Sequence, residues 1–159
     1  TSFAEEMQSR NITPQFKLIY AKDVDPTLKV LRALALSPKQ KAFLIERVQI
    51  ADKEPIALAR GYWIPEIGAQ LAQSDLNRIA LYEIVEQQLH IPLVEADESI
   101  SACVADADIA RKLGISRHSP LLVRRRLTYT TEMRPIEYTT TFYRADQYEY
   151  TIRLARHGV

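Results

Sequence analysis

Cysteine is almost absent from this sequence of 159 residues, since Cys103 stands alone. An internal disulfide is therefore impossible, which fits a reducing compartment. No apolar run approaches the ~20 residues that a membrane-crossing helix needs, and no signal-peptide pattern is found at the N-terminus. From these absences we expect a cytoplasmic protein that does not associate with a membrane.

Glycine is also scarce, and the four glycines are scattered along the chain. This spacing excludes the glycine-rich loops that hold phosphates in nucleotide-binding proteins. The histidines His90, His118 and His157 lack the spacing of metal ligands, so we expect no metal and no other cofactor. Cys103 lies in a predicted strand with no histidine nearby in sequence, which favours a buried structural thiol over a nucleophile.

Strong net charge is lacking too, because lysine and arginine exceed the acidic residues by only one. A domain that binds nucleic acid by counterion release is usually clearly basic, so this balance argues against DNA binding by this chain. The basic triplet at residues 124–126 is interpreted as a solvated strand face. The length corresponds to one domain, and the proportion of apolar residues is that of an ordinary globular protein.

The spacing of apolar residues predicts alternating helices and hairpins. Two hairpins with few parallel crossovers indicate an α+β domain built on a largely antiparallel sheet. The predicted helices cover residues 3–10, 26–36, 76–90 and 107–113, and the predicted strands cover residues 17–24, 42–51, 56–64, 93–104, 121–130, 136–144 and 148–154.

Capping residues mark the ends of these helices. Residues 2–5 have the form of a capping box, and Gly114 is placed to end the last helix in the left-handed conformation. Asp25 and Pro26 predict the start of the second helix, and Ser74 or Asp75 predicts the cap of the third.

Strand alternation gathers polar side chains on single faces of three predicted strands. Such a face can simply be solvated, and it can equally line a pocket for a small polar ligand, because binding sites need a few convergent polar groups on rigid elements. In a pocket, Arg47 would bind a carboxylate or a phosphate. The set comprises Arg47 and Gln49 in the strand 42–51, Ser99 and Ser101 in the strand 93–104, and Glu137, Thr139, Thr141 and Tyr143 in the strand 136–144.

Five segments of the sequence, in order along the chain, resemble the UTRA domain. This domain is the effector domain of the HutC branch of GntR-type bacterial transcription regulators, and the similarity covers essentially all of the chain. The segments are SFAEEM at 2–7, IERVQ at 45–49, SISA at 99–102, GISRHSPLL at 114–122 and PIEYTTTFYRADQY at 135–148.

The resemblance implies a fold like that of chorismate lyase and a homodimer that senses a small metabolite, often a phosphorylated sugar. Effector binding would lower the operator affinity of a separate N-terminal winged helix-turn-helix domain, as in a repressor. Such a segment is missing from this sequence. We therefore expect residues 1–159 to be the effector-sensing domain alone, which reaches operator DNA only through that other domain.

The resemblance also assigns effector-binding positions. Members that bind sugar phosphates are similar to this chain at Phe3, Arg47, Tyr82, Glu137 and Tyr143. Together with the strand-face residues Gln49, Ser99 and Ser101, these positions make up the predicted ligand-binding site.

Three positions depart from the pattern of the sugar-phosphate binders. Those members carry a second arginine where Gln49 stands, a carboxylate where Ala59 stands and a hydroxyl where Ala80 stands. Losing one guanidinium removes a charged hydrogen bond worth about 1.5–3 kcal/mol. The departures therefore imply a small polar or anionic ligand that is less anionic than a sugar phosphate or differently placed.

Two other functions stay open at this point. The fold implied by the resemblance also supports a pyruvate-eliminating enzyme of the chorismate lyase type, with Arg47 holding carboxylates and Glu137 donating a proton. A dimerisation module with a solvated polar face is the third possibility. An assay for 4-hydroxybenzoate formed from chorismate tests the enzyme, and a thermal-shift screen for ligands tests the module.

Overall fold

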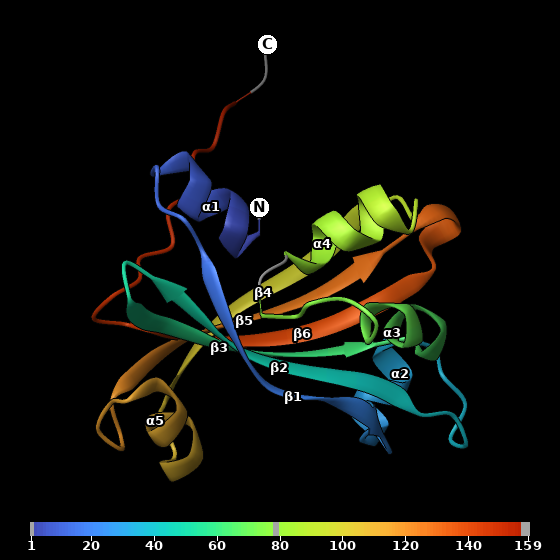
Figure 1. Cartoon of the computed structure of the whole chain (residues 1–159), viewed down its shortest axis with the longest axis horizontal. Coiled ribbons are helices and arrows are strands. Elements are labelled where there is room, and N and C mark those ends of the chain that lie inside the picture. Colours follow the sequence, from blue (N-terminus) through green and yellow to red (C-terminus); the bar gives the residue numbers. More distant parts are fainter. Residues whose placement is uncertain (1, 78–79, 157–159) are drawn as a thin grey trace.

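The computed structural model describes residues 2–77 and 80–156, which form one six-stranded sheet flanked by short helices (Figure 1). All neighbouring strands are antiparallel, in the order β1-β2-β3-β6-β5-β4, which confirms the predicted α+β class. The strands are β1 (Gln15–Val24), β2 (Ala42–Ala51), β3 (Glu54–Trp63), β4 (Glu95–Val104), β5 (Pro120–Tyr129) and β6 (Pro135–Arg144). The helices are α1 (Phe3–Ser9), α2 (Leu28–Ala33), α3 (Pro65–Leu71), α4 (Leu81–Glu83), the π-helix η1 (Ile84–Gln88), α5 (Ala107–Leu113) and the 3₁₀-helix η2 (Thr131–Met133).

Both predicted hairpins are confirmed. In the first, β2 joins β3 through a two-residue turn in which Asp52 and Lys53 have φ of 50° and 66°. Positive φ at both turn residues is the geometry that matches the right-handed twist of the flanking strands. In the second hairpin, β5 and β6 pair along nearly their whole length. These hairpins bring β3 and β6 together at the centre of the sheet.

The first and last predicted helices have the caps that the sequence indicates. Ser2 accepts a hydrogen bond from the amide of Glu5, whose carboxylate accepts one from the amide of Ser2, so the capping box is complete. Asp106 caps α5 through the amide of Ile109 at 2.8 Å. Gly114 ends α5 with φ of 67°, in the left-handed region that glycine enters without strain.

The predicted cap of the second helix is wrong by two residues. Thr27, rather than Asp25, accepts the hydrogen bond from the amide of Val30, and α2 begins at Leu28. Asp25 instead forms an ion pair with Lys41 at 3.0 Å. Asp and Thr are both favourable N-cap residues. Thr27 caps the helix because the Asp25 side chain is bound to Lys41 instead.

The third predicted helix begins at Leu81 and not near Ser74 or Asp75. The residues before it are held by contacts with the sheet: Leu76 is buried in the core, and the Asn77 side chain accepts a hydrogen bond from the Leu18 amide of β1 at 2.9 Å. After one turn the helix widens, because the Leu89 amide bonds to the carbonyl five residues back.

Helix α3 was not predicted, although Pro65 at its first position is a typical start signal. It lies so close to β2 that a Cβ atom added to Gly68 would meet the Cβ of Phe43 at 2.1 Å. Only glycine therefore allows α3 to pack at this distance from the sheet.

We expect Gly68→Ala to lower the free energy of unfolding by about 1–3 kcal/mol, because the extra methyl forces α3 away from β2. Urea unfolding followed by circular dichroism measures the loss. Gln70→Ala, on the exposed side of the same helix, is the matched control and should change stability little. Equal stability of both variants would contradict the close packing.

The predicted closing strand 148–154 is wrong, because these residues form no strand and the chain leaves the body of the domain beside α1 (Figure 1). Tyr148 is buried and stacks on Tyr143 with 3.9 Å between ring centroids. Further along, Ile152 is 60% exposed and Leu154 is 82% exposed. The alternating pattern is present, but residues 148–154 pair with no strand of the described chain.

Cys103 is exposed, which corrects the prediction of a buried thiol. It lies on β4, one of the two edge strands of the sheet. All residues of β4 are exposed. Alternation in this strand predicts a buried face, yet no helix of the described chain covers it. Burial was therefore decided by the position of the strand in the sheet and not by its own sequence.

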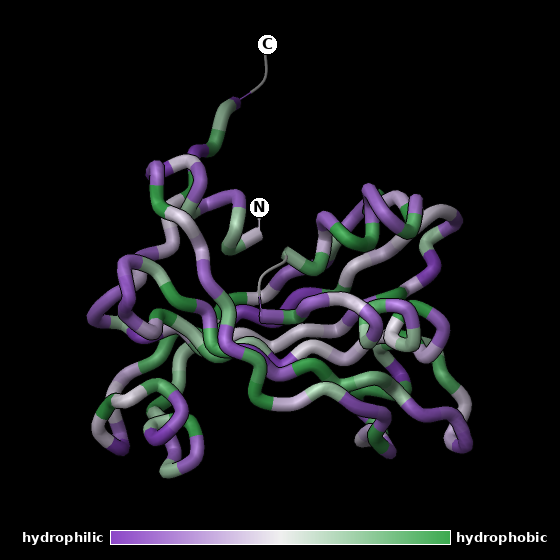
Figure 2. The backbone as a smooth tube through the Cα atoms, in the orientation of Figure 1, coloured by the Kyte–Doolittle hydropathy of each residue, from purple (hydrophilic) through white to green (hydrophobic). Residues whose placement is uncertain are grey.

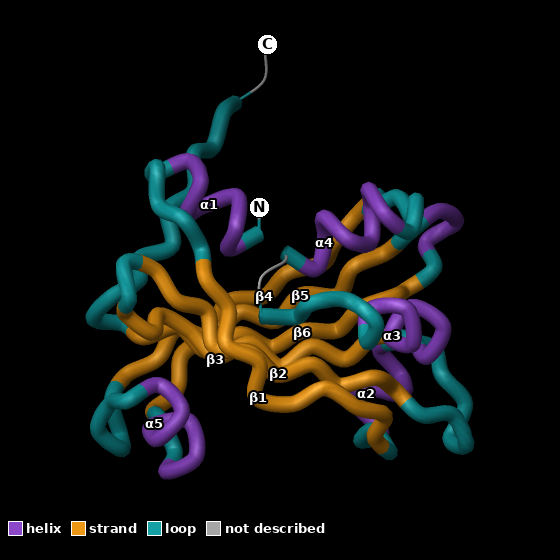
Figure 3. The backbone as a smooth tube through the Cα atoms, viewed as in Figure 1, coloured by secondary structure: helices purple, strands orange, loops and turns teal. Residues whose placement is uncertain are grey.

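Hydrophobic residues run through the central strands and along one side of the helices, whereas polar residues mark the turns (Figure 2). On the face opposite α1, buried Glu46 of β2 binds Arg60 of β3 and Lys112 of α5, each at 2.5 Å. This ion cluster fixes α5 on that side. Helices α1 and α4 lie on the other side, at opposite ends of the sheet (Figure 3).

Candidate functional site

A cavity opens on the sheet face that α1 and α4 flank. The space between its protein atoms is about 680 Å³, which includes solvent at the open mouth. Its lining residues are Ser2, Phe3, Ala4, Phe16, Ile45, Arg47, Gln49, Ala59, Gly61, Ala80, Leu81, Tyr82, Arg124, Arg126, Glu137, Thr139 and Thr141.

Two parallel rows of paired residues form the floor of the cavity. In one row, Arg47 of β2 pairs with Ala59 of β3, then Thr141 of β6 and Arg124 of β5. The neighbouring row runs through Ile45, Gly61, Thr139 and Arg126 in the same strand order. Each row thus has small side chains at its centre, which leaves room for a ligand above β3 and β6.

Arg47 is buried and is held by a hydrogen bond and an aromatic ring. Its side chain is 6% exposed, Nη1 donates to the Leu76 carbonyl at 3.2 Å, and the guanidinium lies over the Phe16 ring at 4.0 Å. Burial lowers the pKa of Arg47 to about 10, while the charge of Glu137 acts in the opposite direction. The group stays protonated at neutral pH and presents a rigid, partly desolvated cation to the cavity.

Glu137 is a preorganised acceptor at the other side of the cavity. Its carboxylate accepts hydrogen bonds from the hydroxyls of Tyr82 at 2.6 Å, Thr128 at 2.8 Å and Thr139 at 2.7 Å. Burial, and then the charge of Glu137, raises the pKa of Tyr82 well above its usual value, so that its hydroxyl remains a donor. The three hydroxyls fix the orientation of the carboxylate.

The basic triplet is not a solvated face, which corrects the interpretation of residues 124–126. Arg124 is buried, and Arg126 is bonded to Glu98 of β4 at 2.7 Å; both lie on the cavity face. Only Arg125 points to the opposite face, where it donates to Ser101 at 3.1 Å. Alternation along the strand predicts that Arg124 and Arg126 share one face and that Arg125 lies on the other. The sequence does not reveal which of the two faces lines the cavity.

The structure brings five of the eight predicted site residues to the cavity: Phe3, Arg47, Gln49, Tyr82 and Glu137. Tyr143 is buried beside it, under the guanidinium of Arg124 at 5.1 Å, but is not among the lining residues. Ser99 and Ser101 are a correction: Ser99 pairs with Arg125, so both serines lie on the outer face of the edge strand. A one-residue shift in strand register separates the two faces, and no signal in the sequence fixes that register.

Two buried polar atoms near the cavity have no hydrogen-bond partner among the described residues. They are Oε1 of Gln49 and the hydroxyl oxygen of Tyr143. Burial raises the pKa of Tyr143 to about 12, so the hydroxyl is neutral at physiological pH. Buried polar groups are normally satisfied, and the amide oxygen of Gln49 in the cavity wall is therefore available to a ligand donor.

Within the described ranges, no three His, Cys, Asp or Glu side chains are grouped so that they could hold a metal ion. His90 and His118 are exposed, and His157 lies outside the described residues. No helix in the same part of the chain is long and apolar enough to cross a membrane.

Comparison with known proteins places this architecture in a family. The UTRA domain model matches residues 9–149. The HTH-type transcriptional repressor NagR of Bacillus subtilis is 29% identical over 150 residues, which cover 94% of this chain and 61% of NagR. The HTH-type transcriptional regulator GgaR of Escherichia coli is 26% identical over 147 residues, which cover 92% of this chain and 57% of GgaR.

Solved structures share the fold. The effector domain of PhnF from Mycobacterium smegmatis has a TM-score of 0.90 at 19% identity, covering 98% of this chain and 95% of that domain. The C-terminal domain of the histidine utilization repressor from Pseudomonas syringae has a TM-score of 0.81 at 18% identity, covering 90% and 99%. Because the family model spans most of the sequence and the sheet matches these solved domains, the chain belongs to the UTRA domain family.

Proposed function

We propose that this domain senses a small polar or anionic metabolite in the cavity between α1 and α4. The observation that carries the proposal is the buried guanidinium of Arg47, which faces the same cavity as the preorganised carboxylate of Glu137. A buried cation favours an anionic partner, and a carboxylate with fixed orientation can accept ligand hydroxyls. Phe3, Gln49 and Tyr82 complete the walls of the site.

The ligand would control DNA binding by another part of a larger protein. The chain spans about three fifths of the length of the curated relatives it matches. NagR is named as a repressor, and by analogy we propose that effector binding weakens the operator affinity of a separate N-terminal winged helix-turn-helix domain. Such a regulator would work in the cytoplasm, where the operator DNA is found.

A thermal-shift screen of phosphorylated sugars, sugar acids and small carboxylates tests this function. A ligand that binds only the folded state at ~100 times its dissociation constant adds about 2.7 kcal/mol to the free energy of unfolding. We expect at least one class of anionic metabolite to raise the melting temperature, and neutral sugars of the same size serve as the control. Equal responses to both classes would contradict an anion-selective site.

The observed geometry does not favour the chorismate lyase alternative. Glu137 accepts three hydrogen bonds from hydroxyl groups, an arrangement that suits an ionised acceptor rather than a proton donor. The relatives reported above are named as transcription regulators. Formation of 4-hydroxybenzoate from chorismate by the purified domain would favour the enzyme and overturn the sensor proposal.

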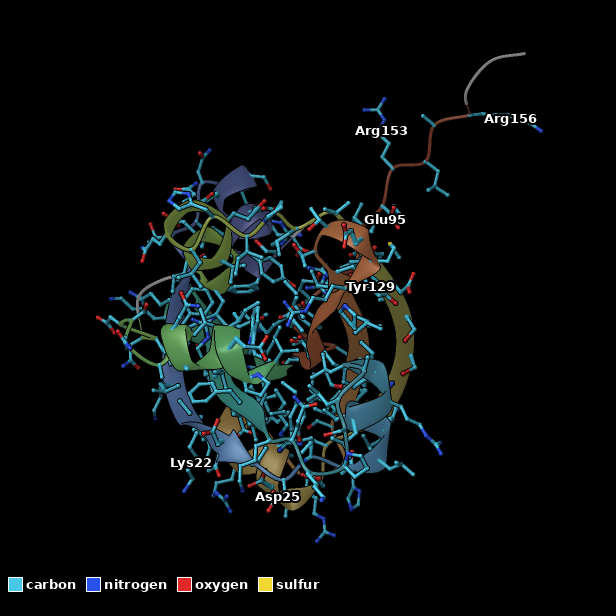
Figure 4. The ribbon with its side chains drawn as sticks, turned by 90° about the vertical axis from the view of Figure 1, so that its right-hand side faces the viewer. Lys22, Asp25, Glu95, Tyr129, Arg153 and Arg156 are labelled. Carbon is cyan, nitrogen blue, oxygen red and sulfur yellow. The ribbon has the colours of Figure 1, made fainter. Side chains whose placement is uncertain are left out.

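We expect the domain to form a homodimer through a sheet edge or exposed apolar strand surface. Edge strand β4 exposes Ile100 and Val104, and the segment after Tyr148 exposes Ile152 and Leu154. Figure 4 shows Arg153 and Arg156 projecting from that segment, away from the body of the domain. An uncovered edge of this length is usually paired. Sedimentation equilibrium at tens of micromolar measures the mass, and a species of only 18.2 kDa would contradict the dimer.

The isolated domain should bind no operator DNA with useful affinity. Its formal net charge is +1, and within the described residues no helix-turn-helix unit presents a basic recognition helix. Mobility-shift assays at low and moderate salt, with random DNA as the control, test the expectation. Sequence-specific, salt-sensitive shifts by this chain alone would show that the domain contacts DNA itself.

A further inference from the structure

Arg124 is a second buried cation at the cavity, and the function proposed above gives it no role. It lies on β5, three strands away from Arg47 but in the same cross-sheet row. Arg124 and Arg47 are each 6% exposed. Both arginines line the cavity, at opposite sides of its floor.

The hydrogen-bonding capacity of Arg124 is poorly used within the protein. A guanidinium carries five N–H donors, yet in the described part of the chain only Nη1 has an acceptor, the Glu6 carboxylate at 3.3 Å. Glu98 is 3.9 Å away and is bonded more closely to Arg126, at 2.7 Å. Charge-assisted hydrogen bonds are normally about 2.7–2.9 Å long. The remaining donors of a cation this deeply buried indicate a place for an external anion.

One anionic group cannot reach both arginines at once. Their Cα atoms are separated by three strand spacings, or about 14 Å. The side chains also lean apart, because Arg47 lies over Phe16 of β1 while Arg124 is directed towards Glu6 of α1 and Glu98 of β4. The space between them lies above Ala59 and Thr141, whose side chains are small.

We propose that the effector carries two separate anionic groups, carboxylate or phosphate, one bound by Arg47 and the other by Arg124. This inference rests on the proposed sensing function and narrows its ligand class to an elongated dianion. The body of the ligand lies over the small residues of the floor, within reach of the oriented carboxylate of Glu137. A compact ligand with a single anionic group would contact only one of the two arginines.

Binding at Arg124 also has a cost that the structure identifies. The incoming anion competes with Glu6, whose carboxylate contacts Arg124 and accepts a hydrogen bond from Tyr148 at 2.8 Å. The ligand therefore weakens a contact between α1 and β5. Glu6→Gln, which removes the competing charge, should tighten anion binding in this half of the cavity.

The experiment uses inorganic phosphate as a probe of each cation separately. Melting temperatures are measured in phosphate against chloride at equal ionic strength, for the unaltered domain, Arg47→Gln and Arg124→Gln. Arg125→Gln, on the opposite face of the same strand as Arg124, is the matched control. We expect each single variant to lose about tenfold or more in phosphate affinity at its own site and to keep the affinity of the other site, because one charged hydrogen bond is lost. In the variant that lacks both arginines, the melting temperature in phosphate should equal that in chloride.

Linked probes test whether one ligand spans both sites. A series of α,ω-dicarboxylates of about five to ten carbons is compared with monocarboxylates of equal length, using calorimetry. The dicarboxylate that fits should bind more tightly than its monocarboxylate to the unaltered domain, and this advantage should vanish in either arginine variant. Circular dichroism confirms that the variants are folded.

Each contrary result would overturn a different part of the proposal. An Arg124→Gln variant with unchanged phosphate response, beside a weakened Arg47→Gln, overturns the second anion site and leaves the proposed sensing function intact. Unchanged responses in both variants overturn the sensing function at this cavity as well. A series in which no dicarboxylate exceeds its monocarboxylate overturns the dianionic ligand class.

Discussion

Replacing Arg47 with alanine is expected to weaken effector binding by about 1.5–3 kcal/mol, or roughly tenfold to 150-fold, the range of a hydrogen bond to a charged group. The guanidinium is held by the Leu76 carbonyl and the Phe16 ring, so it is in place before the ligand arrives. Little ordering entropy is then lost on binding, and the contact contributes its full strength. Alanine removes the cation without adding a competing group.

Isothermal titration with the ligand found by thermal shift measures this loss. Glu137→Gln should have a milder effect, because the amide keeps one acceptor oxygen while it loses the charge. Arg125→Ala, which changes a cation on the outer face, controls for the general loss of positive charge. An Arg47→Ala domain that unfolds cooperatively and binds with unchanged affinity would place the site elsewhere, with the polar strand face merely lining an unoccupied cavity.

Replacing Trp63 with alanine is expected to lower the free energy of unfolding by about 3–5 kcal/mol, the usual loss when a fully buried aromatic side chain is truncated. Trp63 is 0% exposed and belongs to the largest core cluster. It also packs edge-on against Tyr82, with 6.4 Å between ring centroids, and Tyr82 is one of the three residues whose hydroxyls orient Glu137. The cavity left by alanine therefore weakens both the core and the site above it.

Trp63→Phe separates these contributions. The indole Nε1 is buried and has no hydrogen-bond partner among the described residues, so its removal should cost little. Most of the aromatic packing is kept, and we expect a clearly smaller loss than for alanine. Urea unfolding of the two variants gives the comparison. Equal losses would indicate that the indole forms a contact that phenylalanine cannot replace.

Local signals were sufficient for most of the fold. The capping box at Ser2, the left-handed position at Gly114 and the alternation of the two hairpins depend on interactions within a few residues, and each is confirmed. The site residues Arg47 and Glu137 were found partly from alternation and partly from a family resemblance. Both lie in central strands, where a polar side chain on a buried face is unusual enough to stand out.

Only the tertiary structure decided which face of each strand is buried or lines the cavity, and where the third predicted helix begins. Arg124 has the sequence signature of a solvated basic face, yet strand pairing turns it into the cavity, because the register of β5 against β6 fixes which side chains share a face. The register of β4 against β5 directs Ser99 and Ser101 outwards. Leu76 and Asn77 have a helical pattern but are held by the sheet edge, and Cys103 alternates like a buried residue on a strand that nothing covers. The sequence by itself determined most of the elements, the caps of the first and last predicted helices and the polar character of two inner strands, since these depend on near neighbours. Contacts between residues far apart in the chain determined the cavity and its second cation.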